Sequence, residues 1–180
     1  MNLNELRDRV YKCACEHGFY EEKKPDEHSL MLTICEVSEM VEADRNNNYP
    51  DVDAFTKNDI INDCDFYDKF ERFIKDTVWD ECADVAIRMF SFAGEKKYDL
   101  PDDSYKSFDG IAIENVDLTI IGYAACAILV DLSIQTIEKV KSVIVLMYKI
   151  ADSRNVNLSW FIQQKMRYNE MRPYKNGKRY

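Results

Sequence analysis

The chain of 180 residues is long enough for one ordinary domain with its own core, and too short for two domains to be the default. Hydrophobic residues make up 46% of it and charged residues 32%, a balance that excludes a disordered tail and a collagen-like fibre. The net charge of −9 disfavours non-specific binding to a nucleic-acid polymer, whose phosphate backbone attracts Lys and Arg. A small phosphorylated ligand, bound through a metal ion, remains compatible with this charge.

The sequence predicts a cytoplasmic protein that does not enter a membrane. Its first twelve residues, MNLNELRDRVYK, are charged and lack the apolar stretch of a secretory signal. The longest apolar run, residues 118–130, is shorter than the roughly 20 residues that span a bilayer. The six cysteines form no CxxC pair, which favours free thiols in a reducing compartment over disulfides or a zinc site.

The first half of the chain predicts two helices and then an irregular segment. Apolar residues recur every three or four positions over residues 3–17, and Gly18 is expected to end that helix. The next helix follows a cap at Asp26 or Ser29 and runs to about Arg45. After the break NNNYPDVD, residues 54–73 are polar with scattered aromatic residues, which indicates a surface insertion with a short irregular helix.

The second half continues the helical pattern. A third strong helix is predicted from residue 73 to near Gly94, followed by a polar loop over residues 95–110. Two helical stretches, about 116–133 and 134–154, can form either a hairpin or one bent rod. The last helix starts near residues 157–159 and ends before Pro173. Because no strand-like alternation appears and Gly and Pro are few, we expect a single all-α domain built as a helical bundle.

Two pairs of carboxylates lie at helical spacing inside these helices. Glu36 and Glu39 are three residues apart in the second helix, and Glu81 and Asp84 are three apart in the third, so each pair shares one face. With 33 Asp and Glu in the chain, either pair alone is more often a solvated helix face. Apolar residues nevertheless flank both pairs, and ionised carboxylates in such a setting need a counter-charge, for which a divalent cation is the strongest choice.

The ligand chemistry favours magnesium. An all-oxygen set of donors suits Mg²⁺, with Mn²⁺ as an alternative, better than it suits zinc. The chain has only two histidines, and neither forms the Glu-x-x-His pair of a di-iron bundle.

Basic residues are concentrated in the last helix and beyond it. From Lys165 onward there are six Lys and Arg against one acid, Glu170. A solubilising charged tail is one explanation. The other is a binding face, because Lys165, Asn169 and Arg172 recur at spacings of four and three and so place a cation, an amide and a guanidinium on one side of a helix. Such a set suits phosphate oxygens and a sugar hydroxyl.

Taken in order, these blocks resemble the MazG-like, all-α nucleoside triphosphate pyrophosphohydrolases. The resemblance rests on LTICEVSEMVEADR, WDECADVAIRMFSFAG and KMRYNEMRPYKNGKRY, which together cover roughly a third of the chain. Compared with the compact family pattern, the chain has insertions at about 46–72 and 95–154, and it has Ser91 where related sequences tend to have an acid.

The resemblance implies an enzyme that hydrolyses nucleoside or deoxynucleoside triphosphates to the monophosphate and pyrophosphate. Its Mg²⁺ is expected on Glu36, Glu39, Glu81 and Asp84, with Glu36 or Glu39 accepting the proton of the attacking water. The basic residues of the terminal block would neutralise the charge of the departing pyrophosphate. The resemblance also implies a dimer or tetramer. The residues expected to contact phosphate and nucleotide are Lys165, Asn169 and Arg172.

Two other functions remain open from the sequence. One is a helical binding protein that senses nucleotide or metal without turnover, and the other is a scaffold whose acids are ordinary surface charge. Arg45 and Arg88 are candidates to bind the metal-site acids from outside the site, although a salt bridge within one helix is the expected role of each, Arg45 with Glu42 and Arg88 with Asp84. Four aromatic residues are candidates to stack on a base, although core packing is the expected role of each: Trp79, Trp160, Phe19 and Tyr20.

Overall fold

The computed structural model describes residues 2–57, 60, 62–100, 113, 116–177 and 179, and every regular element in that part of the chain is helical. The predicted all-α helical bundle is therefore confirmed. Residues 101–110 of the predicted polar loop lie outside the described residues. The elements are α1 (Leu3–Glu16), α2 (Asp26–Arg45), α3 (Val52–Thr56), α4 (Asp63–Phe73), α5 (Val78–Lys96), α6 (Leu118–Val130), α7 (Thr136–Ser153), α8 (Leu158–Glu170) and the 3-10 turn η1 (Tyr174–Gly177).

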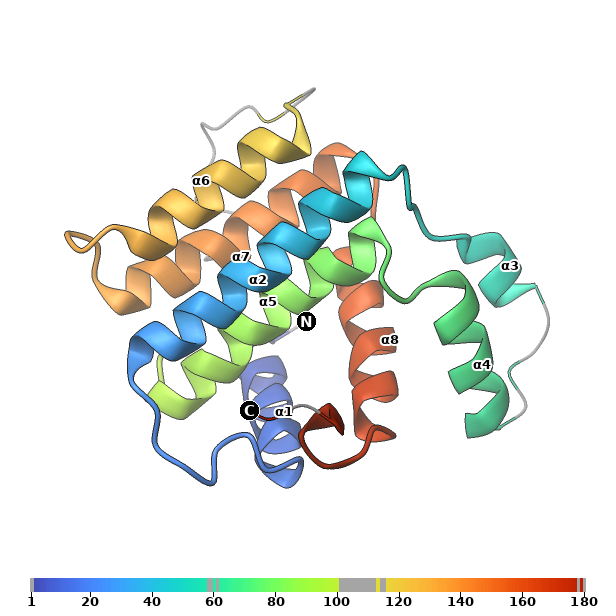
Figure 1. Cartoon of the computed structure of the whole chain (residues 1–180), viewed down its shortest axis with the longest axis horizontal. Helices are drawn as coiled ribbons and strands as arrows, with labels where there is room; N and C mark the ends of the chain where they lie inside the picture. Colours follow the sequence, from blue (N-terminus) through green and yellow to red (C-terminus); the bar gives the residue numbers. More distant parts are fainter. Residues whose placement is uncertain are drawn as a thin grey trace.

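Helix α5 is the centre of the bundle. It packs against α1, α2, α7 and α8, and it runs beside α2 along much of its length (Figure 1). Between Val78 and Gly94 every residue except Asp84 and Arg88 is buried. A helix that is buried all round is expected to be apolar all round, so the acids within it are exceptions that need a reason.

The segment between α2 and α5 differs from the prediction. In place of one short irregular helix it forms two, α3 and α4, and the fourth helix ends at Phe73, where the third strong helix had been expected to start. The expected start is wrong by five residues, because residues 74–77 form a turn in which Asp76 has a φ of 59° and Thr77 has an extended conformation before Val78. Such a turn cannot continue a helix.

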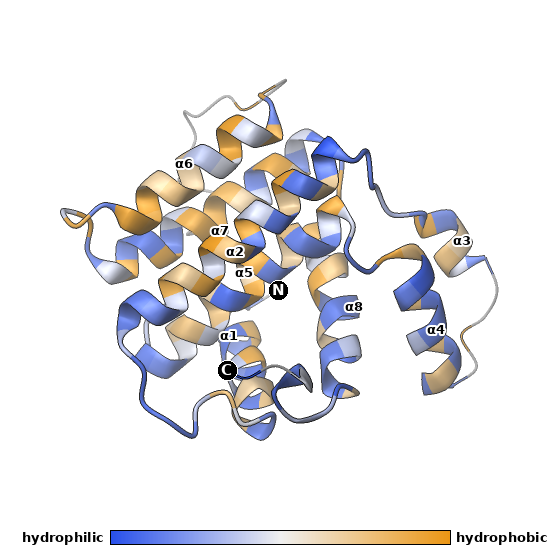
Figure 2. Cartoon of the chain, in the orientation of Figure 1, coloured by the Kyte–Doolittle hydropathy of each residue, from blue (hydrophilic) through white to orange (hydrophobic). Residues whose placement is uncertain are grey.

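Helices α6 and α7 form a hairpin, which decides between the two arrangements left open by the sequence. The first ends at Val130 and the second begins at Thr136, and the two pack against each other. The buried Lys139 donates from Nζ to the Leu129 carbonyl at 2.8 Å and so ties the two helices together. Helix α6 also packs on α2, and it is coloured mostly as hydrophobic in Figure 2.

Gly18 ends α1, as predicted, and lets two chain segments meet. It has a φ of +80°, and a Cβ placed there would lie 2.1 Å from a ring carbon of Tyr174. The close approach allows the Lys175 N–H to donate to the His17 carbonyl at 2.8 Å. The turn η1 therefore lies between the ends of α1 and α8 (Figure 1).

Candidate functional site

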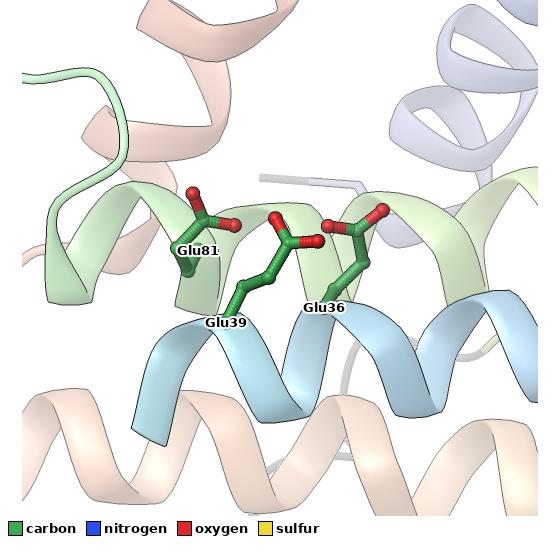
Figure 3. Close-up of side chains that lie close together, drawn as sticks. All are labelled: Glu36, Glu39 and Glu81. Atoms are coloured by element: carbon green, nitrogen blue, oxygen red, sulfur yellow. The ribbon is translucent and has the colours of Figure 1, made fainter. Parts of the chain in front are cut away.

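Packing of α2 against α5 brings three of the predicted acids together. Glu36 and Glu39 of α2 and Glu81 of α5 each offer an oxygen, and these oxygens all lie within 4.8 Å of one another. Figure 3 shows the three carboxylates on the same side of the paired helices. Glu36 and Glu81 are buried, whereas Glu39 is exposed. Solvent therefore reaches this group of carboxylates at Glu39.

Glu36 is held by Arg88 from the neighbouring helix. Arg88 Nε and Nη2 lie 2.9 and 2.8 Å from the same oxygen, Glu36 Oε1. The expected pairing of Arg88 with Asp84 within one helix is therefore wrong, because the guanidinium crosses to α2. Burial and the nearby Asp84 raise the pKa of Glu36, and Arg88 opposes this rise. Glu36 Oε2 is left for another partner. Arg45 does pair with Glu42, as expected.

The fourth predicted acid, Asp84, has a basic partner of its own. Lys165 Nζ lies 2.7 Å from Asp84 Oδ2 and 2.7 Å from Asp80 Oδ2. The Lys165 side chain is only 5% exposed, and its ammonium lies 5.8 and 5.9 Å from the ring centroids of Phe70 and Tyr168. Burial lowers the pKa of Lys165, but the two carboxylates outweigh burial and raise it. The structure thus places Lys165 inside the acid cluster, where it stays charged.

Asp80 is a member of this cluster that the sequence interpretation missed. It is 1% exposed, and its Oδ2 accepts from the Asp76 N–H at 3.0 Å as well as from Lys165. Its Oδ1 accepts no hydrogen bond from the described residues. Burial raises the pKa of Asp80 to about 7 against the opposing effect of Lys165. Its position four residues before Asp84 was the signal in the sequence, since that spacing puts both on one helical face.

Glu81 is the least compensated acid of the site. Its Oε2 is buried and accepts no hydrogen bond from the described part of the chain. Burial, followed by repulsion from Asp84, raises its pKa to about 9. A buried acceptor without a donor calls for a proton, a water molecule or a cation. The neighbouring carboxylates are hard oxygen donors, and that donor set fits Mg²⁺ or Mn²⁺.

All seven predicted site residues line one cavity of about 710 Å³. That volume lies within the roughly 300–1,000 Å³ of typical ligand pockets. Asn169 reaches the cavity from α8, and its Oδ1 is buried without a donor among the described residues. Helices α6 and α7 contribute no residue to the wall. The predicted residues on the wall are Glu36, Glu39, Glu81, Asp84, Lys165, Asn169 and Arg172.

Basic side chains form another part of the wall. Arg172, Lys175 and Arg179 come from the segment after α8, and Lys24 comes from the connection between α1 and α2. Arg179 thus lines the cavity although it lies beyond the helical face of Lys165, Asn169 and Arg172, since the chain bends back at η1 after Pro173. Lys178 lies outside the described residues.

Of the four aromatic residues considered for base stacking, two line the cavity. Phe19 and Tyr20 contribute to its wall, and the Tyr20 hydroxyl lies 2.8 Å from Ser91 Oγ. Trp79 and Trp160 do not line it; Trp160 instead makes an edge contact with the buried Phe55 at a centroid distance of 5.6 Å. Phe19 and Tyr20 are thus the aromatic groups placed to meet a ligand.

No family model, curated protein or solved structure matches this chain. The function is therefore argued from the geometry and chemistry of the cavity.

Proposed function

We propose that the chain is a Mg²⁺-dependent nucleoside or deoxynucleoside triphosphate pyrophosphohydrolase of the MazG-like kind. The observation that carries the proposal is the convergence of Glu36, Glu39 and Glu81 in a cavity whose wall also holds basic side chains. An acid cluster paired with a basic wall suits a ligand that is a metal complex of a polyphosphate.

Glu36, Glu39 and Glu81 are the residues that hold Mg²⁺ in this proposal, with Mn²⁺ as a substitute and Asp84 as a further ligand. When bound, the ion polarises phosphate oxygens and the attacking water. Arg88 holds one oxygen of Glu36, and Lys165 holds one oxygen each of Asp80 and Asp84, which fixes these carboxylates and leaves their other oxygens available. The acid set is therefore preorganised by the protein itself.

The hydrolytic step needs a base and a group of cations. Glu39 is the base in this proposal, because among the described residues it has no hydrogen bond or ion pair, whereas Glu36 is bound to Arg88. Water adds to the α-phosphorus, its proton goes to Glu39, and the bond from the α-phosphorus to the bridging oxygen breaks. Arg172, Lys175 and Arg179 neutralise the departing pyrophosphate, and the nucleoside monophosphate remains as the second product.

The decisive experiment is a screen of the common NTPs and dNTPs for pyrophosphate release with Mg²⁺. We expect release from at least one nucleotide, and a loss of at least 100-fold in Glu39→Gln and Glu81→Gln, with no loss in Asp68→Asn, an exposed acid on α4. If no nucleotide is hydrolysed, the enzyme proposal fails. Metal-dependent nucleotide binding without turnover would instead support the non-catalytic sensor.

We also propose a homo-oligomer, a dimer or tetramer, in the cytoplasm. The apolar residues Ile120, Tyr123, Val130 and Leu132 are exposed on α6 and just after it, and Leu132 is 97% exposed. Exposed apolar groups of this extent favour a protein interface. All six cysteines are free, which suits a reducing compartment. No helix in the described part of the chain has both the length and the apolar character needed to cross a membrane.

A further inference from the structure

A second group of carboxylates lies directly beside the first and shares one member with it. Asp76, Asp80 and Glu81 each offer an oxygen, and these oxygens lie within 4.8 Å of one another. Glu81 also belongs to the group formed with Glu36 and Glu39. The two groups therefore meet at one side chain, and that side chain has two oxygens.

The second group contains buried oxygens that lack a donor. Asp80 Oδ1 and Glu81 Oε2 are both buried and accept no hydrogen bond from the described residues. The other interactions of the two aspartates use one oxygen of each: Asp80 Oδ2 accepts from Lys165 at 2.7 Å and from the Asp76 N–H at 3.0 Å, and Asp76 Oδ2 accepts from Lys75 at 3.0 Å. One oxygen of each aspartate is thus left for a different partner.

The local charge favours a second cation once a triphosphate arrives. The two groups together with Asp84 hold six carboxylates, whereas the basic side chains bound to them are Lys75, Lys165 and Arg88. One divalent ion leaves a net negative charge facing a polyanion. A second divalent ion neutralises the charge that remains.

We infer that Asp76, Asp80 and Glu81 form a second divalent-cation site, with Glu81 bridging it to the site formed by Glu36, Glu39 and Glu81. Paired metal sites of this kind hold their ions roughly 3.5–4 Å apart and suit phosphoryl chemistry. The inference rests on one part of the proposed function, the binding of a metal ion by Glu36, Glu39 and Glu81, and does not depend on the hydrolytic activity. Asp80 precedes Glu81 in the first turn of α5, and Asp76 lies in the turn before this helix, so the turn at residues 74–77 is what places Asp76 beside the other two.

The test is the number of Mn²⁺ ions bound per chain, measured from the loss of the electron paramagnetic resonance signal of free Mn²⁺ on titration into the full chain. We expect two ions for the unaltered protein, with spin coupling between them. Asp76→Asn and Asp80→Asn should each bind one, and Asp68→Asn should still bind two. Asp76 is exposed, so Asp76→Asn is expected to fold even if the buried Asp80→Asn does not.

The outcomes separate this inference from the proposed function. One bound ion in the unaltered protein, lost in Glu39→Gln and kept in Asp76→Asn, overturns the second site and leaves the first intact. Two ions that persist in both aspartate variants also overturn it, since the second ion then lies elsewhere. If the unaltered protein binds no Mn²⁺, both the inference and the proposed function are wrong. In that case a proton or a water molecule satisfies the buried oxygens.

Discussion

At the scale of single residues, the acids of the site differ in whether a basic side chain or a hydrogen-bond donor stabilises their negative charge. Glu36 has Arg88, and Asp80 and Asp84 share Lys165, whereas Glu81 has a buried oxygen without a donor. The acid that burial disfavours most in its charged form is thus the one at the centre of the cluster.

This imbalance predicts how stability depends on pH. The pKa of Glu81 is raised from an ordinary 4.5 to about 9, so between these values the folded protein holds a proton that the unfolded chain has released. The free energy of unfolding of the metal-free protein should therefore fall as pH rises from 5 to 9, by at most about 1.4 kcal/mol per pH unit for one proton. Urea unfolding at several pH values measures this. Glu81→Gln should flatten the slope between pH 7 and 9, and an unchanged slope would contradict the assignment.

Neutralising one acid should separate stability from metal binding. Glu39→Gln removes a negative charge from the cluster, and Glu81→Gln replaces an acid that must bind a proton when the metal-free chain folds, so both metal-free variants should melt at or above the temperature of the parent. They should also lose most of the stabilisation that Mg²⁺ gives by binding only the folded form. Thermal unfolding with and without Mg²⁺ tests both points. Asp68→Asn, which changes an exposed acid on α4, is the control.

Lys165 and Arg172 should differ in their roles: we expect Lys165 to contribute to stability as well as activity, and Arg172 to contribute to substrate binding alone. Lys165→Ala leaves the buried Asp80 and the partly buried Asp84 without their cation, so it should lower the free energy of unfolding by about 3 kcal/mol along with activity. Arg172→Ala should leave stability nearly unchanged and raise KM, because Arg172 is partly exposed on the cavity wall. Steady-state kinetics and melting of the same two variants distinguish them. Equal small losses in both would favour a charged tail without a binding role.

At the scale of elements, the spacing of apolar residues predicted that the helices exist, but it predicted their first and last residues less accurately. The periodic pattern placed Glu36 and Glu39 on one face of α2 and Glu81 and Asp84 on one face of α5, whereas only the family resemblance implied that the two faces meet. The break before Val78 was missed because Phe73 and Ile74 fit the apolar pattern of both α4 and α5. Asp80 was missed for a related reason: its burial depends on α8 supplying Lys165, a contact between residues 85 positions apart.

The turn at Gly18 is the element-scale feature that can be tested most directly. An alanine there is strained at positive φ, which costs more than about 1 kcal/mol, and its Cβ would displace the Tyr174 ring. Gly18→Ala should therefore lower the melting temperature and weaken nucleotide binding through displacement of Lys175, while Mn²⁺ binding at the acids is kept. Isothermal titration with each ligand measures the two effects. Equal losses of nucleotide affinity and Mn²⁺ affinity would mean that η1 supports the whole fold.

At the scale of the whole molecule, the exposed apolar residues of α6 predict association. Sedimentation should give a dimer or tetramer, and Tyr123→Glu together with Val130→Glu should shift it toward the monomer without loss of helix content, since both side chains are more than half exposed. Met31→Glu, an exposed apolar residue on α2, is the control. A parent that stays monomeric at high concentration would show that this face serves another purpose.

The burial of α5 has a further consequence for motion. Because this helix is both the centre of the core and the support of Asp80, Glu81 and Asp84, its amide hydrogens should exchange with solvent only when the whole domain opens. The opposite wall, formed by the segment after α8 and by residues 18–25, has few buried groups and should exchange by local opening. Ligand entry would then involve movement of the basic wall over a carboxylate wall that stays fixed.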